Sequence, residues 1–113
     1  MLPFEITVHQ AKELLDSTAS SAQPRIRLID VREPWEAQRA AIPGSELIPM
    51  NEFAARAHQE LDPDEHLLIV CKMGGRSLSV TNWLRQQGFA TAQSVAGGID
   101  AWSRLIDPSI PRY

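Results

Sequence analysis

Short apolar runs alternate with stretches of helical periodicity along this chain, and no other feature constrains the fold as much. Residues 26–31 and 67–70 are typical of buried strands. Apolar residues before, between and after these runs recur at helical spacing. Strands separated by helices of this length require right-handed crossovers between parallel strands. The sequence therefore predicts an α/β domain, with a mostly parallel sheet and helices on both faces.

Capping residues and glycines indicate where the remaining elements begin and end. Thr7, with Gln10 three residues later, predicts the start of one helix, and we expect Asn51 to cap another. Pro34 suits the first turn of a short helix, and Gly88 is typical of the position after a helix end. The other expected segments are short strands over 46–48 and 93–95, a helix over 99–105, a polar loop over 17–24 and an extended tail over 107–113.

The composition is that of one ordinary globular domain, which we expect to occupy residues 1–113. The chain has 113 residues, of which 43% are hydrophobic and 22% charged, so disorder and fibrous architectures are excluded. The net charge of −3 argues against a nucleic-acid binder. The longest apolar run, 67–71, is too short to cross a membrane, and residues 1–5 lack the features of a signal peptide. We expect a soluble, cytoplasmic protein.

The one cysteine of the chain, Cys71, follows the most apolar strand, and ligand sites of such sheets lie beyond the carboxyl ends of the strands. Gly74 and Gly75 let the backbone turn its amides inward as an anion-binding nest, next to a helix start and to the charges of Lys72 and Arg76. A sulfur in that setting should exist largely as thiolate, and the same donors suit an oxyanion. A lone cysteine after a strand is more often a buried small hydrophobe. The combination of strand end, cysteine, glycines, arginine and helix start favours a reactive site.

Four motifs, in order, carry a resemblance to a known family. Residues 71–77 resemble the active-site loop of single-domain rhodaneses: cysteine, two residues, glycine, one residue, arginine and serine. Residues 30–33 match the family's Asp-hydrophobic-Arg-Glu box, and residues 42–45 match its Ile-Pro-Gly-small turn. Gly97, Gly98 and Trp102 match its carboxyl-terminal motif. The resemblance implies a rhodanese-like, parallel five-stranded sheet flanked by helices.

The resemblance also implies sulfurtransferase activity without a cofactor or a metal. Cys71 would take the outer sulfur of thiosulfate or of a persulfide donor, release sulfite from thiosulfate, and hold the sulfur as a persulfide. A thiol, or cyanide, would accept it in a second half-reaction. Arg76 is the second expected catalytic residue. The expected substrate-binding residues are Lys72, Met73, Gly74, Gly75, Ser77, Asp30 and Arg32, although Asp30 and Arg32 also suit a structural ion pair.

Three other functions stay open beside this one. Rhodanese-fold phosphatases have five residues between cysteine and arginine, whereas four intervene here, which suits sulfur better than phosphate. Inactive rhodanese-like binding or regulatory modules typically lack the cysteine. The Cys-Lys opening of the loop resembles rhodanese domains joined to adenylating enzymes, so a relay to a ubiquitin-like sulfur carrier protein is an alternative.

The remaining candidates are assigned to packing or to the surface. Trp35, Trp83 and Trp102 fit the apolar faces of helices and are expected in the core. His9, His58 and His66 have no ligand spacing and are expected at the surface. Ala40 and Ala41 stand where the family usually has Gly-His, which leaves no histidine for a role at the pocket edge.

Overall fold

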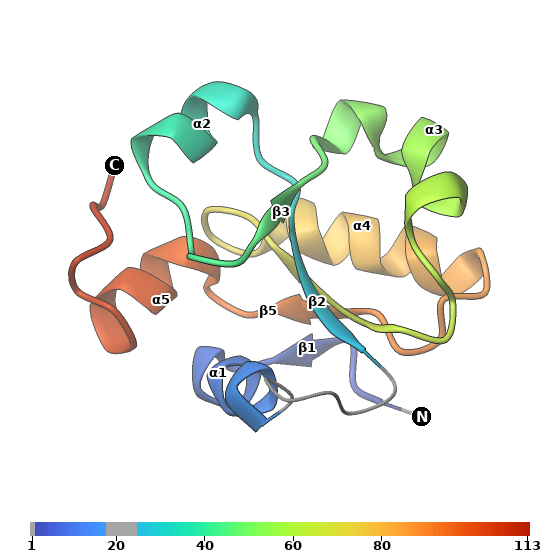
Figure 1. Ribbon diagram of the computed structural model, residues 1–113, viewed down its shortest axis with the longest axis horizontal. Helices are drawn as coiled ribbons and strands as arrows, with labels where there is room; N and C mark the ends of the chain where they lie inside the picture. Colours follow the sequence, from blue (N-terminus) through green and yellow to red (C-terminus); the bar gives the residue numbers. More distant parts are fainter. Residues whose placement is uncertain (1, 18–24) are drawn as a thin grey trace.

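The computed structural model describes residues 2–17 and 25–113, so the polar loop expected over 17–24 lies, apart from Ser17, outside the described residues. Strands and helices alternate along the described chain (Figure 1). They are β1 (Glu5–Ile6), α1 (Val8–Ser17), β2 (Ile26–Asp30), α2 (Pro34–Arg39), β3 (Glu46–Leu47), α3 (Met50–Glu60), β4 (His66–Val70), α4 (Gly75–Gln86), β5 (Gln93–Val95) and α5 (Gly98–Leu105).

The five strands form one parallel sheet in the order β1-β5-β4-β2-β3. β4 lies at its centre and pairs with β2 over five residues, from Ile26 opposite His66 to Asp30 opposite Val70. On its other side β4 pairs with β5, where Ile69 lies opposite Ser94. Because all strands are parallel, their carboxyl ends lie at one edge, and the segment that follows β4 emerges in the middle of that edge.

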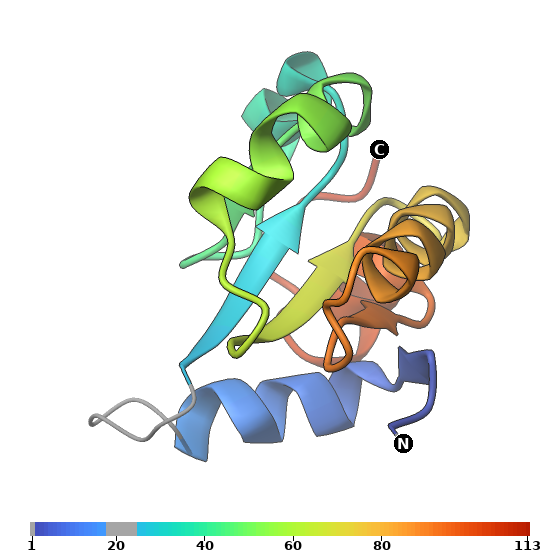
Figure 2. The ribbon, with the colours of Figure 1, turned by 90° about the vertical axis from the view of Figure 1, so that its right-hand side faces the viewer.

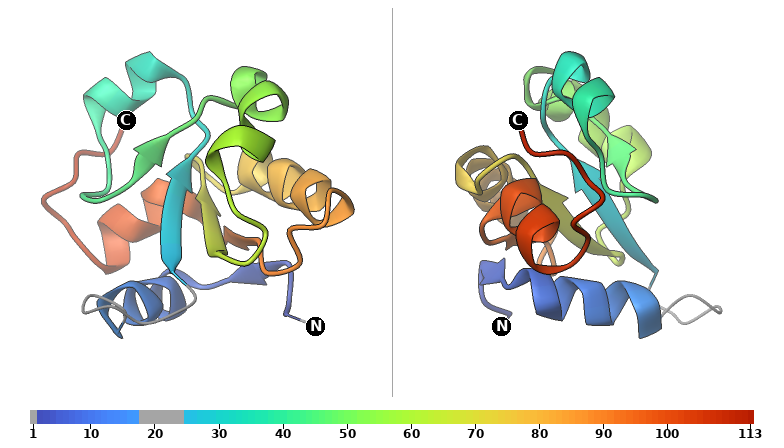
Figure 3. Two further views of the ribbon diagram at one scale, coloured as in Figure 1. Left: turned by 45° about the vertical axis from the view of Figure 1, so that its right-hand side comes forward. Right: turned by 90° about the vertical axis from the view of Figure 1, so that its left-hand side faces the viewer.

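Helices cover both faces of the sheet, as the sequence predicted (Figures 2 and 3). Side chains along β4 alternate between two apolar clusters: Leu68 and Val70 lie in the cluster shared with α1 and α5, and Leu67 and Ile69 in the cluster shared with α3 and α4. All four side chains are almost fully buried. No helix among the described residues is long and apolar enough to cross a membrane.

Most of the expected helix ends are confirmed. The Thr7 amide donates to Gln10 Oε1 (3.0 Å) and the Gln10 amide to Thr7 Oγ1 (3.1 Å), a reciprocal cap at the start of α1. Gly88, with φ of 97°, follows the end of α4. The expected cap at Asn51 is wrong, because α3 already begins at Met50 after Pro49. The Met50 amide donates to the carbonyl of Val31 (3.0 Å), so the first turn gains a backbone acceptor without a side-chain cap.

The edge strand β1 over residues 5–6 was not expected, because two residues are too few to give an alternating pattern. Two other expectations need correction. Trp35 is 53% exposed, because the six-residue α2 lies at the carboxyl edge rather than against the core, whereas Trp102 is buried and Trp83 half-buried. The tail over 107–113 is extended only at its end: the Ile110 amide bonds the carbonyl of Asp107 (3.1 Å), and Ile110 is buried.

The expected surface positions of the histidines hold for two of the three. His9 and His58 are exposed, whereas His66 is half-buried as the first residue of β4. Its ring Nε2 lies 2.8 Å from Gln93 Oε1 on β5, so a hydrogen bond to the neighbouring strand accounts for its partial burial.

Candidate active site

The sulfur of Cys71 lies at the carboxyl end of the central strand, inside a ring of backbone. Cys71 directly follows β4 and is 1% exposed. Its Sγ accepts hydrogen bonds from the amides of Gly74 (3.0 Å) and Ser77 (3.3 Å), and the thiol lies 3.4 Å from Ser77 Oγ. Burial alone would also suit a small core residue. Two amides directed at the sulfur distinguish it from such a residue, because a core thiol needs no ring of donors.

The loop keeps further amide donors free. Gly74 adopts φ of 111°, a left-handed conformation that glycine allows without strain, and it caps α4. Among the described residues, the amides of Met73, Gly75 and Arg76 have no hydrogen-bond acceptor. These unpaired donors and the first turn of α4 are available to bond an anion at the loop.

The carbonyl groups of the same loop are held by α5. The amide of Ile99 donates to the carbonyl of Cys71 (2.8 Å), and the amide of Asp100 to that of Lys72 (3.0 Å). Gly98, with φ of 59°, permits this approach, because a Cβ there would overlap both carbonyl oxygens. The Gly-Gly motif of the sequence thus fixes the first half of the cysteine loop.

Ser77 connects the loop to β5. It is completely buried, and its Oγ lies 3.1 Å from the carbonyl oxygen of Gly74 and 2.7 Å from Ser94 Oγ. The sequence analysis did not identify Ser94 as a residue of the site. A serine inside a buried strand nevertheless indicates that its hydroxyl has a hydrogen-bond partner.

Arg76 is bound to Glu36 on α2. Its guanidinium makes a two-pronged ion pair with the Glu36 carboxylate, at 2.6 Å and 3.0 Å. This bond to Arg76 is the largest reason that the pKa of Glu36 falls to about 2, and it raises the pKa of Arg76 above its ordinary value. The sequence did not indicate Glu36 as a site residue, because a glutamate three residues after Glu33 is typical of a helix cap. Glu36 also has that role, since the Glu33 amide donates to Glu36 Oε1 (3.1 Å).

The other two side chains of the loop lie at its outer side. Lys72 is half-buried, with its ammonium 4.5 Å from the centre of the Tyr113 ring, and Met73 is 62% exposed. Lys72 therefore carries its charge next to the carboxyl-terminal tail, whereas the Met73 side chain lies in solvent.

Asp30 and Arg32 form a buried ion pair. Arg32 is 0% exposed, and its Nη2 lies 2.6 Å from Asp30 Oδ2 and also donates to the carbonyl of Ala40 (2.6 Å). Nη1 donates to the hydroxyl of Tyr113 (2.8 Å) and to the carbonyl of Glu36 (3.4 Å). With Nε on Asp30, every guanidinium N–H has a partner, so no donor remains for a substrate. Ala40, which stands where the family usually has glycine, contributes only its backbone carbonyl to Arg32. Alanine can therefore fill this role as glycine would.

The ion pair between Glu36 and Arg76 predicts an acid-sensitive contribution to stability. The pKa of Glu36 is about 2 in the folded chain against an ordinary value of 4.5, so protonation favours the unfolded chain. The contribution is complete above pH 4.5 and is lost as pH falls from there through about 2. Denaturant unfolding across this pH range should show that the free energy of unfolding falls less steeply with falling pH in Glu36→Gln than in wild type. Arg76→Ala should reduce this pH dependence similarly. A pH dependence equal to that of wild type in both variants would show that the ion pair is not its source.

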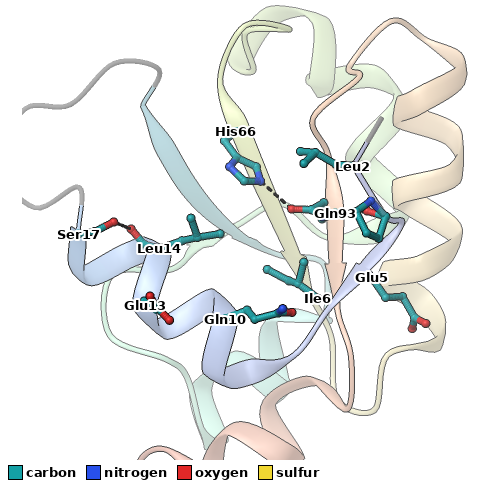
Figure 4. A pocket seen from close by; sticks show the side chains of 10 residues that line it. Leu2, Glu5, Ile6, Gln10, Glu13, Leu14, Ser17, His66 and Gln93 are labelled. Carbon is teal, nitrogen blue, oxygen red and sulfur yellow. Dashed lines mark hydrogen bonds between the residues drawn. The ribbon is translucent and has the colours of Figure 1, made fainter.

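A separate cavity of about 440 Å³ lies at the opposite edge of the sheet, where β1, β4 and β5 begin (Figure 4). Leu2, Ile6 and Leu14 give it apolar walls, and the bonded pair His66 and Gln93 also lines it. It contains no nucleophile comparable to Cys71. Among residues 2–17 and 25–113, no three His, Cys, Asp or Glu side chains gather as metal ligands would. The candidate site is therefore the carboxyl edge, on the contacts of Cys71 described above.

A comparison with known protein families agrees with this geometry. The family model that describes the rhodanese-like domain matches residues 7–105 of the chain. The chain belongs to the rhodanese-like family. In this family member, all four expected motifs contribute to one edge of the sheet: the cysteine loop, the Asp30–Arg32 pair, the turn after Ala40, and the two glycines at the start of α5.

Named relatives include sulfurtransferases. A chloroplastic rhodanese-like/PpiC domain-containing protein 12 of Arabidopsis thaliana is 44% identical over 90 residues, which are 77% of this chain and 30% of that protein. A sulfurtransferase of Allochromatium vinosum is 34% identical over 79 residues, 70% of this chain and 73% of that protein. The adenylyltransferase and sulfurtransferase MOCS3-1 of Zea mays is 31% identical, over 96% of this chain and 23% of its own. This chain thus spans less than a third of the first and last of these relatives.

Among solved structures, the human single-domain sulfurtransferase TSTD1 matches with a TM-score of 0.77 and 28% identity. The match covers 92% of this chain and 98% of that one. These relatives support a rhodanese domain of the sulfurtransferase type.

Proposed function

We propose that this rhodanese domain moves a sulfane sulfur from thiosulfate, or from a persulfide donor, to a thiophilic acceptor through a persulfide on Cys71. The observation that carries the proposal is the pair of amide hydrogen bonds, from Gly74 and Ser77, that end on the sulfur. A thiosulfate–cyanide assay on wild type beside Cys71→Ser tests it.

In the first half-reaction, the Cys71 thiolate attacks the outer sulfur of thiosulfate. A bond forms between the two sulfurs, the S–S bond of thiosulfate breaks, and sulfite leaves with that electron pair. The terminal sulfur then carries the negative charge. The free amides of Met73, Gly75 and Arg76 would stabilise that charge and the departing oxyanion, and such donors contribute about 10²–10³-fold each in other enzymes.

In the second half-reaction, cyanide or a thiolate attacks the terminal sulfur, and the Cys71 thiolate leaves with the electron pair. Thiocyanate or a new persulfide is released, and the enzyme returns to its starting form. The two products leave in separate steps, so the kinetics are ping-pong. Since the chain has one cysteine, no second thiol of its own can resolve the persulfide.

The acceptor distinguishes a general enzyme from a relay. The Zea mays relative joins the words adenylyltransferase and sulfurtransferase in its name, which favours a sulfur carrier protein as a second candidate acceptor. A relay would show slow turnover with cyanide and fast transfer to such a carrier. A binding module would show neither. The cytoplasmic location expected from the sequence stays a prediction.

Lys72 and Arg76 are expected to affect different kinetic constants. Arg76→Ala releases the start of α4 from Glu36, so the loop amides lose their arrangement and kcat should fall about 10²-fold. Lys72→Met removes only a partly exposed charge near the loop, so KM for thiosulfate should rise about threefold, with a weaker salt dependence of kcat/KM. Steady-state kinetics at two ionic strengths measure both. Arg76→Lys is the matched control, because it keeps the charge and loses the two-pronged geometry. Equal kinetics for wild type and all variants would contradict this division.

A further inference from the structure

The carboxyl-terminal tail leads back to the cysteine loop. After α5 the chain passes along the edge of the molecule to α2 (Figure 3). The tail is attached on the way, since Ser103 Oγ donates to the carbonyl of Ile110 and Arg112 Nε lies 3.1 Å from Asp100 Oδ1. These contacts position Tyr113 beside Lys72 of the cysteine loop and Glu36 of α2.

Tyr113 contacts four residues of the site and its surroundings. Its hydroxyl donates to Glu36 Oε2 (2.7 Å) and accepts from Arg32 Nη1 (2.8 Å). Its ring lies beneath the Lys72 ammonium, 4.5 Å from its centre, and meets Trp35 edge-on at 6.2 Å between the ring centres. Tyr113 is therefore bonded to the residue that holds Arg76 and packed against the other cation of the loop.

The two halves of this side chain have separable consequences. The hydroxyl completes the bonding of a carboxylate that is 5% exposed, and that carboxylate in turn fixes the guanidinium at the start of α4. The ring holds the Lys72 ammonium by a cation–π contact. Removal of the hydroxyl takes a donor from Glu36, which loosens Arg76, and an acceptor from Arg32. Removal of the ring also frees Lys72.

We infer that Tyr113 is a positioning residue for the sulfur-transfer site, acting through Glu36 on Arg76 and through its ring on Lys72. The inference rests on the proposed function of that site. It gives the tail a kinetic role: the hydroxyl maintains the turnover rate, and the ring maintains the affinity for an anionic donor.

The kinetic test compares Tyr113→Phe, which keeps the ring, with Tyr113→Leu, which keeps neither part. Tyr113→Phe should lower kcat about fivefold with KM for thiosulfate unchanged. Tyr113→Leu should lower kcat similarly and also raise KM about threefold. In a Lys72→Met background, the change from Tyr113 to Leu should add nothing to KM, because the ring has no ammonium left to hold. Ser109→Ala, which alters a tail hydrogen bond to Asp107 and contacts neither Lys72 nor Glu36, should match wild type.

A second measurement is independent of turnover. Tyr113 is the one tyrosine of the chain, so ultraviolet absorption reports the ionisation of its phenol alone. Burial, and the bond to Glu36, raise the pKa of Tyr113 above its ordinary value, against the opposing bond from Arg32. Glu36→Gln should lower that pKa toward the ordinary one.

The outcomes separate the inference from the proposed function. A wild type that transfers no sulfur from any donor refutes the function, and the inference fails with it. An active wild type with Tyr113→Phe equal to it in kcat refutes the inference alone. So does a KM increase for Tyr113→Leu that persists in the Lys72→Met background, or a tyrosine titration unchanged by Glu36→Gln.

Discussion

Cys71→Ser is expected to fold as the wild type does and to lose thiosulfate–cyanide activity completely. Serine is close to cysteine in size, and its hydroxyl can accept the bonds that Sγ receives from Gly74 and Ser77, so the loop should keep its shape. An alcohol at this position does not ionise near neutral pH and cannot store a sulfane sulfur. No other thiol exists in the chain to replace it.

Intact-mass spectrometry isolates the proposed intermediate. After treatment with thiosulfate and desalting, the wild type should gain one sulfur atom and Cys71→Ser none, and cyanide should return the wild type to its starting mass. Circular dichroism and thermal melting control for folding. Residual activity in a clean Cys71→Ser sample would refute the role of Cys71. A wild type that never gains the atom with any donor would favour a binding module.

Gly98→Ala should damage both activity and stability. The new Cβ would overlap the carbonyl oxygens of Cys71 and Lys72, which are backbone atoms and cannot rotate away. The loop or α5 must shift, which should cost about 1–3 kcal/mol of folding free energy. A displacement of the sulfur by about 1 Å is enough to lower kcat about 10²-fold. Thermal melting and steady-state kinetics measure the two effects.

Gly44→Ala is the matched control for Gly98→Ala. Gly44 also has a positive φ, 87°, but a Cβ there would meet nothing within 4 Å. Both variants strain the backbone, and only Gly98→Ala pushes on the cysteine loop. Gly44→Ala should therefore lose some stability and keep its kcat. Equal kcat values for the two variants would show that contact with the loop is not what Gly98 protects.

The sequence predicted the parts of this molecule that depend on local pattern. The apolar runs gave the position of the central strand, and the reciprocal cap of Thr7 and Gln10 gave the start of α1. The order of strand, cysteine, glycines and helix was enough to expect a ring of amides around the sulfur. Each of these features is determined by residues a few positions apart.

The parts that were missed depend on contacts between distant segments. Glu36 and Arg76 are 40 positions apart, and Tyr113 and Glu36 are 77 apart, so no spacing rule connects them. Trp35 was assigned to the core because a six-residue helix is too short for periodicity to show which face is buried. Asp30 and Arg32 left two interpretations open, and the complete burial of Arg32 favours the ion pair.

The cysteine loop has a consistent polarity, with its first two carbonyl groups bonded outward to α5 and its amides turned inward. The attraction that such a ring exerts on an anion comes from peptide dipoles, which neither titrate nor exchange counterions. Side-chain charges change with pH and are screened by salt, but a dipole held by the main chain is constant under both. The hold of the loop on an anionic sulfur would then change with pH only through the protonation of that sulfur and of Glu36, and not through the amides themselves.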